Sequence, residues 1–123
     1  MKVFFIDAET NVSKLIDIDL TLENYYKILN CRLIDITERR ISGKYFDIIV
    51  DDEGLFDPSN KVSAVYEDGT PALVGSLIIC NHDGEGNETA LSSGDICKIQ
   101  DRLAIATSPG GEKYSVVVLD NKE

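Results

Sequence analysis

The sequence is poor in the residues on which most catalytic, metal and membrane sites depend. Its 123 residues include no tryptophan, three prolines, three cysteines and a single histidine, His82. Hydrolytic triads need a histidine base, so only one position is open to such chemistry. The longest apolar runs, such as residues 77–80, are far shorter than the roughly 20 residues of a membrane helix. The composition therefore disfavours both an enzyme with an established catalytic motif and a membrane protein.

The three cysteines, Cys31, Cys80 and Cys97, are an odd number at wide spacing, and no Cys-x-x-Cys motif occurs. This spacing indicates neither a zinc site nor a disulfide framework. Each cysteine lies among apolar neighbours, so we expect three buried free thiols in a reducing cytosol. Asp7 interrupts the apolar start of the chain before a secretory segment can form. We therefore expect a soluble, cytoplasmic protein that contacts no membrane.

The charge is strongly one-sided, with 22 acidic residues against 12 basic ones and a net charge of -10 at pH 7. Nucleic-acid binding requires clustered Lys and Arg side chains that release counterions. We therefore expect no sequence-specific binding of nucleic acid. The simplest interpretation of the acidic surface is solubility through self-repulsion. The alternative is an acidic mimic of DNA that inhibits a DNA-processing enzyme.

Apolar periodicity in the first half of the chain predicts two pairs of strands and one short helix. Thr21 can cap a helix in which Leu22, Tyr25 and Leu29 follow the helical period. Ser42-Gly43 is a turn signal between two apolar runs. The elements predicted from these patterns are strands 2–7 and 12–18, a helix over 22–29, and strands 31–37 and 44–51.

The second half of the chain predicts further strands and one more helix. Residues 72–80 form the most hydrophobic run, which predicts a central strand in which Gly75 marks a bulge or a close approach of another backbone segment. An exposed loop is expected over 81–88. Ser92 followed by Asp95 resembles a capping box, and Ile96, Ile99 and Leu103 suit the buried stripe of a helix. A final strand is expected over 113–119. These elements predict one α+β domain over residues 1–123, with a mostly antiparallel or mixed sheet of about six strands and two short helices.

Two acidic segments are candidates for a cation site. Asp51, Asp52 and Glu53 are adjacent carboxylates, but neighbours on a strand point to opposite sides, so at most Asp51 and Glu53 could share a metal. The segment Asp83-x-Glu85-x-Asn87 places oxygen ligands at alternate positions, as a calcium loop does. It lacks the glycine that such a loop needs at its sixth position and the glutamate at its twelfth. A flexible acidic loop is the simpler interpretation.

Nucleophilic and phosphate-binding motifs are weak or absent. Cys80 and His82 would point to the same side of an extended chain, so a thiol–imidazole pair is geometrically conceivable. No nearby sequence suggests an oxyanion hole, and an exposed loop histidine is the simpler interpretation. The sequence has no Gly-x-Gly-x-x-Gly motif, and residues 108–113 lack the spacing of a P-loop.

The order of features resembles one known family. Met1-Lys2-Val3 opens an apolar strand ending in Asp7, and the run Asp47 to Leu55 passes through an acidic turn with Asn60 after it. Together with residues 31–36, 74–79 and 91–92, these features resemble the domain-of-unknown-function family numbered 3846 over about residues 1–103. The resemblance implies small proteins of phages, plasmids and other bacterial mobile elements, without an assigned activity. It places the family's Glu-Gly pattern on Glu53 and Gly54, its asparagine on Asn60 and a glycine on Gly75, and it does not cover the strand 113–119.

Functional contacts concentrate on loops. The polar segments 51–60 and 81–88 therefore supply the predicted binding residues, which are Asp52, Glu53, Asn60 and His82. The leading hypothesis is a non-enzymatic binding or regulatory accessory protein of a mobile element. We expect no catalytic residue, metal or cofactor, and a partner that is a protein or a small molecule. One alternative is a small hydrolase or transferase that uses Glu53 and Asn60, either with or without the help of a divalent cation. Another is an oligomeric structural module that pairs through exposed sheet edges.

Overall fold

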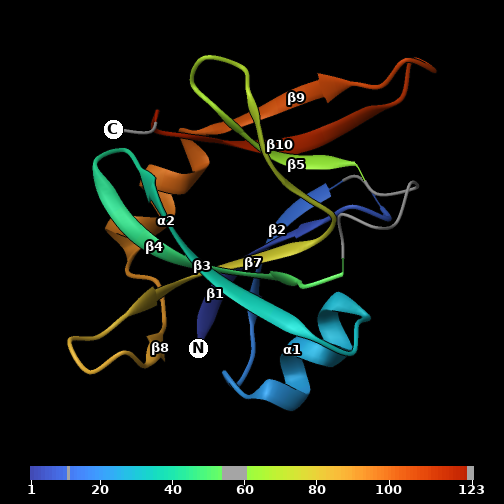
Figure 1. The fold of residues 1–123 in the computed structure, drawn as a ribbon. Helices are drawn as coiled ribbons and strands as arrows, with labels where there is room; N and C mark the ends of the chain where they lie inside the picture. Colours follow the sequence, from blue (N-terminus) through green and yellow to red (C-terminus); the bar gives the residue numbers. More distant parts are fainter. Residues whose placement is uncertain (11, 54–60, 122–123) are drawn as a thin grey trace.

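Two β-sheets and two short helices make up the fold, as a computed structural model shows for residues 1–10, 12–53 and 61–121 (Figure 1). Within these residues, the α+β class is confirmed, with ten strands where about six were expected. Neither helix is long or apolar enough to cross a bilayer in this part of the chain. In chain order the elements are β1 (Lys2–Asp7), β2 (Val12–Asp17), α1 (Leu22–Leu29), β3 (Ile34–Ile41), β4 (Lys44–Asp51), β5 (Val62–Tyr66), β6 (Pro71–Val74), β7 (Leu77–His82), β8 (Glu88–Thr89), α2 (Ser93–Gln100), β9 (Leu103–Thr107) and β10 (Lys113–Leu119).

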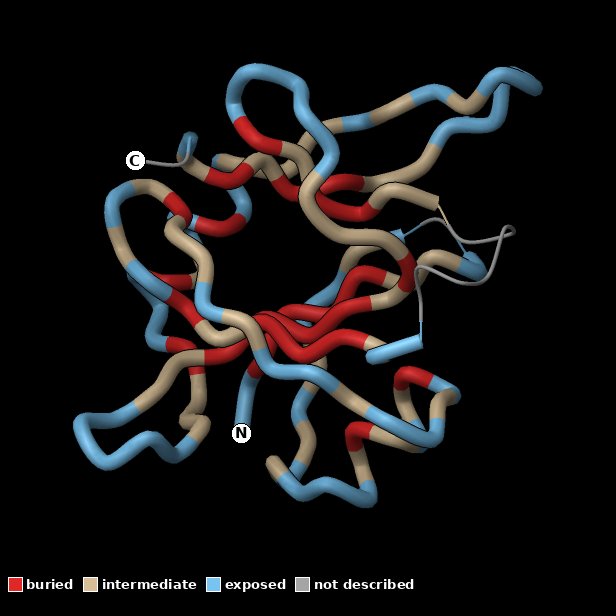
Figure 2. Tube along the Cα trace, viewed as in Figure 1, coloured by how far each residue is buried: buried red, intermediate tan, exposed pale blue. Residues whose placement is uncertain are grey.

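The first sheet has the strand order β2-β1-β7-β4-β3, with β8 paired to β7, and all of its pairs are antiparallel. Its inner strands are covered on both faces. The residues Val3 to Ile6 of β1 are all buried, because Val3 and Phe5 pack with α1 while Phe4 and Ile6 face the second sheet and α2. Figure 2 shows that buried residues are concentrated where these strands cross the middle of the molecule.

The second sheet has the strand order β6-β5-β10-β9, in which β10 is parallel to β5 and antiparallel to β9. Val117 and Leu119 of β10 are fully buried and pack in the main core with Phe46 and Ile48 of β4. β10 is therefore an inner strand of this sheet, although it lies beyond the region of family resemblance. Its hairpin with β9 extends away from the first sheet at the top of Figure 1.

The predicted helices are present, with the caps that the sequence indicates. The hydroxyl of Thr21 accepts a hydrogen bond from the backbone N–H of Asn24 at 3.2 Å, and α1 spans the predicted residues 22–29. Ser92 and Asp95 form the predicted capping box of α2. The helix ends at Gln100, however, so the expectation that Leu103 belongs to its buried stripe is wrong. Leu103 begins β9 instead.

The predicted central strand over 72–80 is in fact two strands in different sheets. β6 belongs to the second sheet and β7 to the first. Gly75 lies between them with φ +79°, a conformation that side chains with a Cβ disfavour. This glycine turns the chain from one sheet to the other, because a residue at positive φ interrupts the extended path of a strand.

The strand expected over 31–37 begins later and runs further, from Ile34 to Ile41. Ser42 and Gly43 both have positive φ, 49° and 81°, which is the geometry of a two-residue type I′ hairpin turn. Such a turn pairs the residues on either side of it, and Ile41 is indeed the direct partner of Lys44. The turn geometry therefore determines where this strand ends.

Two other expectations for loops and thiols need correction. The segment 81–88 is not wholly an exposed loop, because β7 continues through Asn81 and His82 and pairs there with β8. Of the three cysteines, all free, Cys80 is buried as expected, but Cys31 is only half-buried and Cys97 is exposed. Cys97 is exposed because it lies on the face of the short helix α2 that does not pack on the core.

Candidate ligand-binding site

A groove lies between β3 and β6, which are edge strands of the two sheets. Its volume is about 260 Å³. Alternate residues of a strand share a face, so Asp35, Thr37 and Arg39 of β3 lie on the same side. These three residues are paired with Val50, Ile48 and Phe46 of β4. The groove is lined by Asp35, Thr37, Arg39, Val50, Asp51, Asp52, Ala72, Leu73 and Val74.

The groove combines an apolar surface with polar groups along one side. Val50 of β4 and the three β6 residues Ala72, Leu73 and Val74 provide the apolar surface. β3 can carry polar side chains on this side because it is an edge strand and the second sheet covers it only in part, so that Asp35 remains exposed. A few polar groups on a mostly apolar concave surface are typical of small-molecule sites.

Arg39 is the main basic group of the groove. Its Nη1 donates hydrogen bonds to the hydroxyl of Thr37 and, at 3.2 Å, to the backbone carbonyl of Glu38. Its Nε is inaccessible to solvent and has no hydrogen-bond partner. A buried donor without an acceptor costs roughly 1–3 kcal/mol. A ligand offers this nitrogen an acceptor once the guanidinium turns toward the groove, and the hydrogen bond formed there would recover that free energy.

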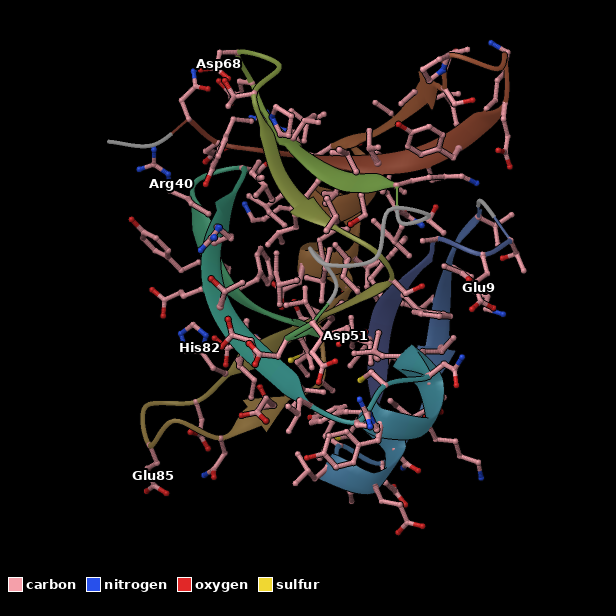
Figure 3. All side chains as sticks on the ribbon, turned by 45° about the vertical axis from the view of Figure 1, so that its right-hand side comes forward. Glu9, Arg40, Asp51, Asp68, His82 and Glu85 are labelled. Atoms are coloured by element: carbon pink, nitrogen blue, oxygen red, sulfur yellow. The ribbon has the colours of Figure 1, made fainter. Side chains whose placement is uncertain are left out.

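The acidic end of the groove lies at the turn that follows β4. The carboxylate of Asp51 accepts a hydrogen bond from the backbone N–H of Glu53 at 2.9 Å. The backbone N–H of Asp52 donates to the carbonyl of Leu33 at 3.0 Å. These contacts fix the turn against the start of β3, and Asp51, labelled in Figure 3, lies at the end of β4.

The residues predicted as binding residues are not gathered at one place. Asp52 lines the groove, whereas Glu53 lies beside it in the same turn, with a carboxylate oxygen 3.6 Å from Nη2 of Arg32. Asn60 lies outside the residues that the structure describes. His82 lies at the end of β7 on the opposite face of the first sheet, where its Nδ1 is 3.3 Å from Oδ1 of Asp47.

The two other groups that the sequence offered for chemistry, the Cys80 thiol and the acidic loop around Asp83, have structural roles. Burial raises the pKa of the Cys80 thiol to about 12, and the nearby carboxylates of Asp47 and Glu88 add to this. The thiol beside His82 is therefore protonated at neutral pH and is a poor nucleophile. The Asp83 carboxylate accepts hydrogen bonds from Asn87 and from the backbone of Glu85, which hold its pKa below the ordinary value. It closes its own loop, and in Figure 3 Glu85 lies at the tip of that loop, pointing away from the sheet.

The sequence matches the family described as Domain of unknown function (DUF3846) over residues 1–104. The chain belongs to the DUF3846 family. The resemblance inferred from the residues is thereby confirmed, and the match ends within β9, so that β10 lies outside it. Searches of curated proteins and of solved structures found no match to this DUF3846 chain.

Sequence reasoning missed most of the residues that line the groove of this DUF3846 protein. The signal for Asp35, Thr37 and Arg39 was present, because polar residues at alternate positions mark one side of a strand. Their position opposite β6 follows only from the packing of one sheet on the other. From the sequence alone, Asp47 belongs to the strand 44–51 and to the family resemblance but not to a site, and the pairing of β4 with β7 brings it near His82.

Proposed function

We propose that this member of the family is a non-enzymatic binding protein whose ligand occupies the groove between β3 and β6. The proposed ligand is a small molecule that carries a carboxylate or phosphate group together with a hydrogen-bond donor. The observation that carries the proposal is the buried, unpartnered Nε of Arg39 in a groove with an apolar surface. As the family resemblance implies, the proposal includes a role as a regulatory accessory protein of a bacterial mobile element.

The chemistry of the lining residues supports this ligand class. The planar guanidinium of Arg binds carboxylate and phosphate groups through paired hydrogen bonds. Asp35 lies four residues away from Arg39 on β3, about 13 Å at the rise of an extended strand. Its carboxylate is suited to accept a hydrogen bond from a hydroxyl or amine of the same ligand. The groove volume of about 260 Å³ favours a ligand of metabolite size.

The lining residues also favour binding over catalysis. Among the described residues that line the groove, there is no histidine, cysteine or lysine. Thr37 is the one hydroxyl residue there, and its oxygen accepts a hydrogen bond from Arg39. A hydroxyl nucleophile needs an adjacent general base. The arrangement suits a site that binds a charged ligand and releases it without chemical change.

A neighbouring hollow on the other side of Arg39 is less suited to a charged ligand. It is lined by Arg40, Tyr45, Tyr66 and Asp120 among others. The Asp120 carboxylate lies 3.2 Å from Nε of Arg40 and accepts backbone hydrogen bonds from Ser42 and Gly43. Its charge is therefore already compensated within the protein. For this reason we place the ligand in the groove between β3 and β6.

Native mass spectrometry tests the proposal after the purified protein is incubated with bacterial lysate. Three proteins are compared: the wild type, Arg39→Gln, and Arg32→Gln as a matched control, because Arg32 is highly exposed and lies outside the groove. We expect the wild type and Arg32→Gln to retain the same adduct of a few hundred daltons. Losing a hydrogen bond to a charged group costs roughly 1.5–3 kcal/mol, so Arg39→Gln should retain it at least about tenfold less.

The proposal is contradicted if no small adduct is retained, or if Arg39→Gln retains as much as the wild type while keeping the same melting temperature. A retained protein without a small adduct would point to an interaction surface instead of the groove. Identification of the adduct by its exact mass then establishes whether it carries the expected carboxylate or phosphate.

A further inference from the structure

Three potential metal ligands meet on the face of the first sheet opposite the groove. The pairing of β3 with β4 places Glu38 directly opposite Asp47, and the pairing of β4 with β7 places Asp47 opposite Cys80. His82 is two residues beyond Cys80 on β7 and therefore lies on the same face. One donor atom from each of Glu38, Asp47 and His82 lies within 4.8 Å of the other two.

The histidine in this cluster has a buried ring nitrogen that the protein does not satisfy. Nδ1 of His82 is inaccessible to solvent and makes no hydrogen bond. It lies 3.3 Å from Oδ1 of Asp47, whose side chain is only 14% exposed. Buried polar atoms in folded proteins nearly always have a partner, so this nitrogen calls for an explanation. A cation between the imidazole and the carboxylates provides one.

The surroundings of the cluster are acidic. Glu88 is paired with His82 across β7 and β8, and it accepts a hydrogen bond from the hydroxyl of Tyr25 at 3.5 Å. Burial raises the pKa of Tyr25 well above its ordinary value, and the charges of Glu88 and Asp47 raise it further. The carboxylates of Glu38, Asp47 and Glu88 place negative charge around His82, which favours the binding of a cation.

We propose that Glu38, Asp47 and His82 bind a single Zn²⁺ ion, with Nδ1 of His82 as its nitrogen ligand. Imidazole nitrogen and carboxylate oxygen are both ordinary zinc ligands, and three protein ligands leave a fourth position for water. Ligand atoms about 2.1 Å from a metal are roughly 3.0–3.5 Å apart. The cluster therefore has to contract slightly, and the exposed side chain of Glu38 is free to rotate inward.

This site is separate from the groove. Arg39 and Asp35 lie on one face of β3 and Glu38 on the other, since side chains alternate along a strand. The zinc proposal therefore stands or fails independently of the proposed ligand in the groove.

The single histidine allows a direct test, because its ring contributes the only two imidazole nitrogen resonances of the chain. The ¹⁵N-labelled protein is titrated with Zn²⁺ and followed by a long-range ¹H–¹⁵N correlation spectrum, while calorimetry measures the affinity. We expect the Nδ1 resonance to shift and to saturate at one equivalent. Replacement of a ligand should weaken binding by about tenfold or more in both Asp47→Asn and Glu38→Gln.

Two control variants address other sources of zinc binding. Glu85→Gln removes an exposed carboxylate from the nearby loop, and Cys97→Ser removes the exposed thiol. Both should bind Zn²⁺ as the wild type does. If Asp47→Asn fails to fold, the exposed position Glu38 still provides the test. Unchanged His82 nitrogen resonances, or zinc binding of wild-type affinity in Glu38→Gln, would overturn the proposal.

Discussion

Nζ of Lys44 lies 2.6 Å from Oδ1 of Asp95, and this ion pair joins the start of β4 to the first turn of α2. Asp95 is only 3% exposed. Its other oxygen, Oδ2, accepts hydrogen bonds from the backbone N–H of Ser92 at 3.0 Å and from the side chain of Asn81 at 3.2 Å. One carboxylate therefore caps α2 and holds it against two strands of the first sheet, β4 and β7.

Replacing Asp95 with asparagine is expected to lower the free energy of unfolding by about 2 kcal/mol, because hydrogen bonds to a charged group are lost. Burial alone would raise the pKa of Asp95, but the hydrogen bonds from Lys44 and Ser92 outweigh it and lower the pKa below 3.8. The contribution of the carboxylate is thus present above pH 3.8 and is lost as the pH falls through the lowered native pKa. Urea unfolding at several pH values measures the difference between wild type and Asp95→Asn.

That difference should be constant near neutral pH and shrink in acid. Asp101→Asn serves as the control, because Asp101 is exposed at the other end of α2 and its replacement should change stability by less than about 0.5 kcal/mol. Equal stability of Asp95→Asn and wild type at pH 7 would show that the ion pair does not secure the helix.

Removal of β10 is expected to prevent folding, although this strand lies outside the family match. Val116, Val117 and Leu119 are buried, and each contributes roughly 1.5–3 kcal/mol through burial. Their sum is comparable to the roughly 5–15 kcal/mol by which a typical domain is stable. A chain ending at residue 107 should show no cooperative thermal transition by circular dichroism, whereas a chain ending at residue 121 should melt as the full chain does. A cooperative transition in the shorter chain would contradict this role of β10.

Gly75→Ala is expected to destabilise the protein by roughly 1–2 kcal/mol, the cost of a left-handed conformation for a residue with a Cβ. Gly75 has φ +79° at the point where the chain passes from β6 to β7. Gly84→Ala is the matched control, because a Cβ there has no atom within 4 Å and its φ is not in the left-handed region. Urea unfolding compares the two variants. Equal effects at both positions would show that the turn at Gly75 imposes no conformational demand.

The three thiols are expected to react at very different rates in the native protein. Cys97 is exposed, whereas burial raises the pKa of both Cys31 and Cys80, the latter to about 12. Because the thiolate is the reactive form, a thiol reagent at pH 8 should modify Cys97 first, and Cys80 only when the protein unfolds. Mass spectrometry of digested protein identifies the modified residue, and Cys97→Ser should abolish the fast reaction. Rapid modification of Cys80 without urea would contradict the burial of this thiol.

Local sequence patterns predicted the elements whose signals lie within a few residues. Thr21 and the helical period located α1, and the Ser92–Asp95 pair located the start of α2. The run over 72–80 was misread because hydrophobicity does not reveal the positive φ of Gly75. Leu103 was misread because its spacing from Ile99 fits a helix as well as the start of a new strand.

The functional surfaces depend on long-range pairing, which the sequence alone does not supply. Asp52 was predicted from its acidic turn, and it does line the groove. Arg39 acquires its position only because β3 is an edge strand opposite β6. His82 was predicted in an exposed loop, but β8 extends the sheet to reach it, and strand register brings it to Asp47. The proposed zinc site takes His82 from β7, which is distant in the sequence from the β3–β4 hairpin, and the groove takes its apolar residues Ala72, Leu73 and Val74 from β6.

The central claim, that Arg39 binds the anionic group of a small ligand, is tested most directly by the Nε–H resonances of the four arginines, Arg32, Arg39, Arg40 and Arg102. A ¹H–¹⁵N spectrum is recorded while acetate, inorganic phosphate, amino acids and nucleotides are added in turn, and Arg39→Gln identifies the resonance of Arg39. We predict that this resonance shifts and saturates with at least one of these compounds while that of Arg32 does not move. If no compound moves the Arg39 resonance, or if all four resonances move together as they would with ionic strength, the groove does not bind such a ligand.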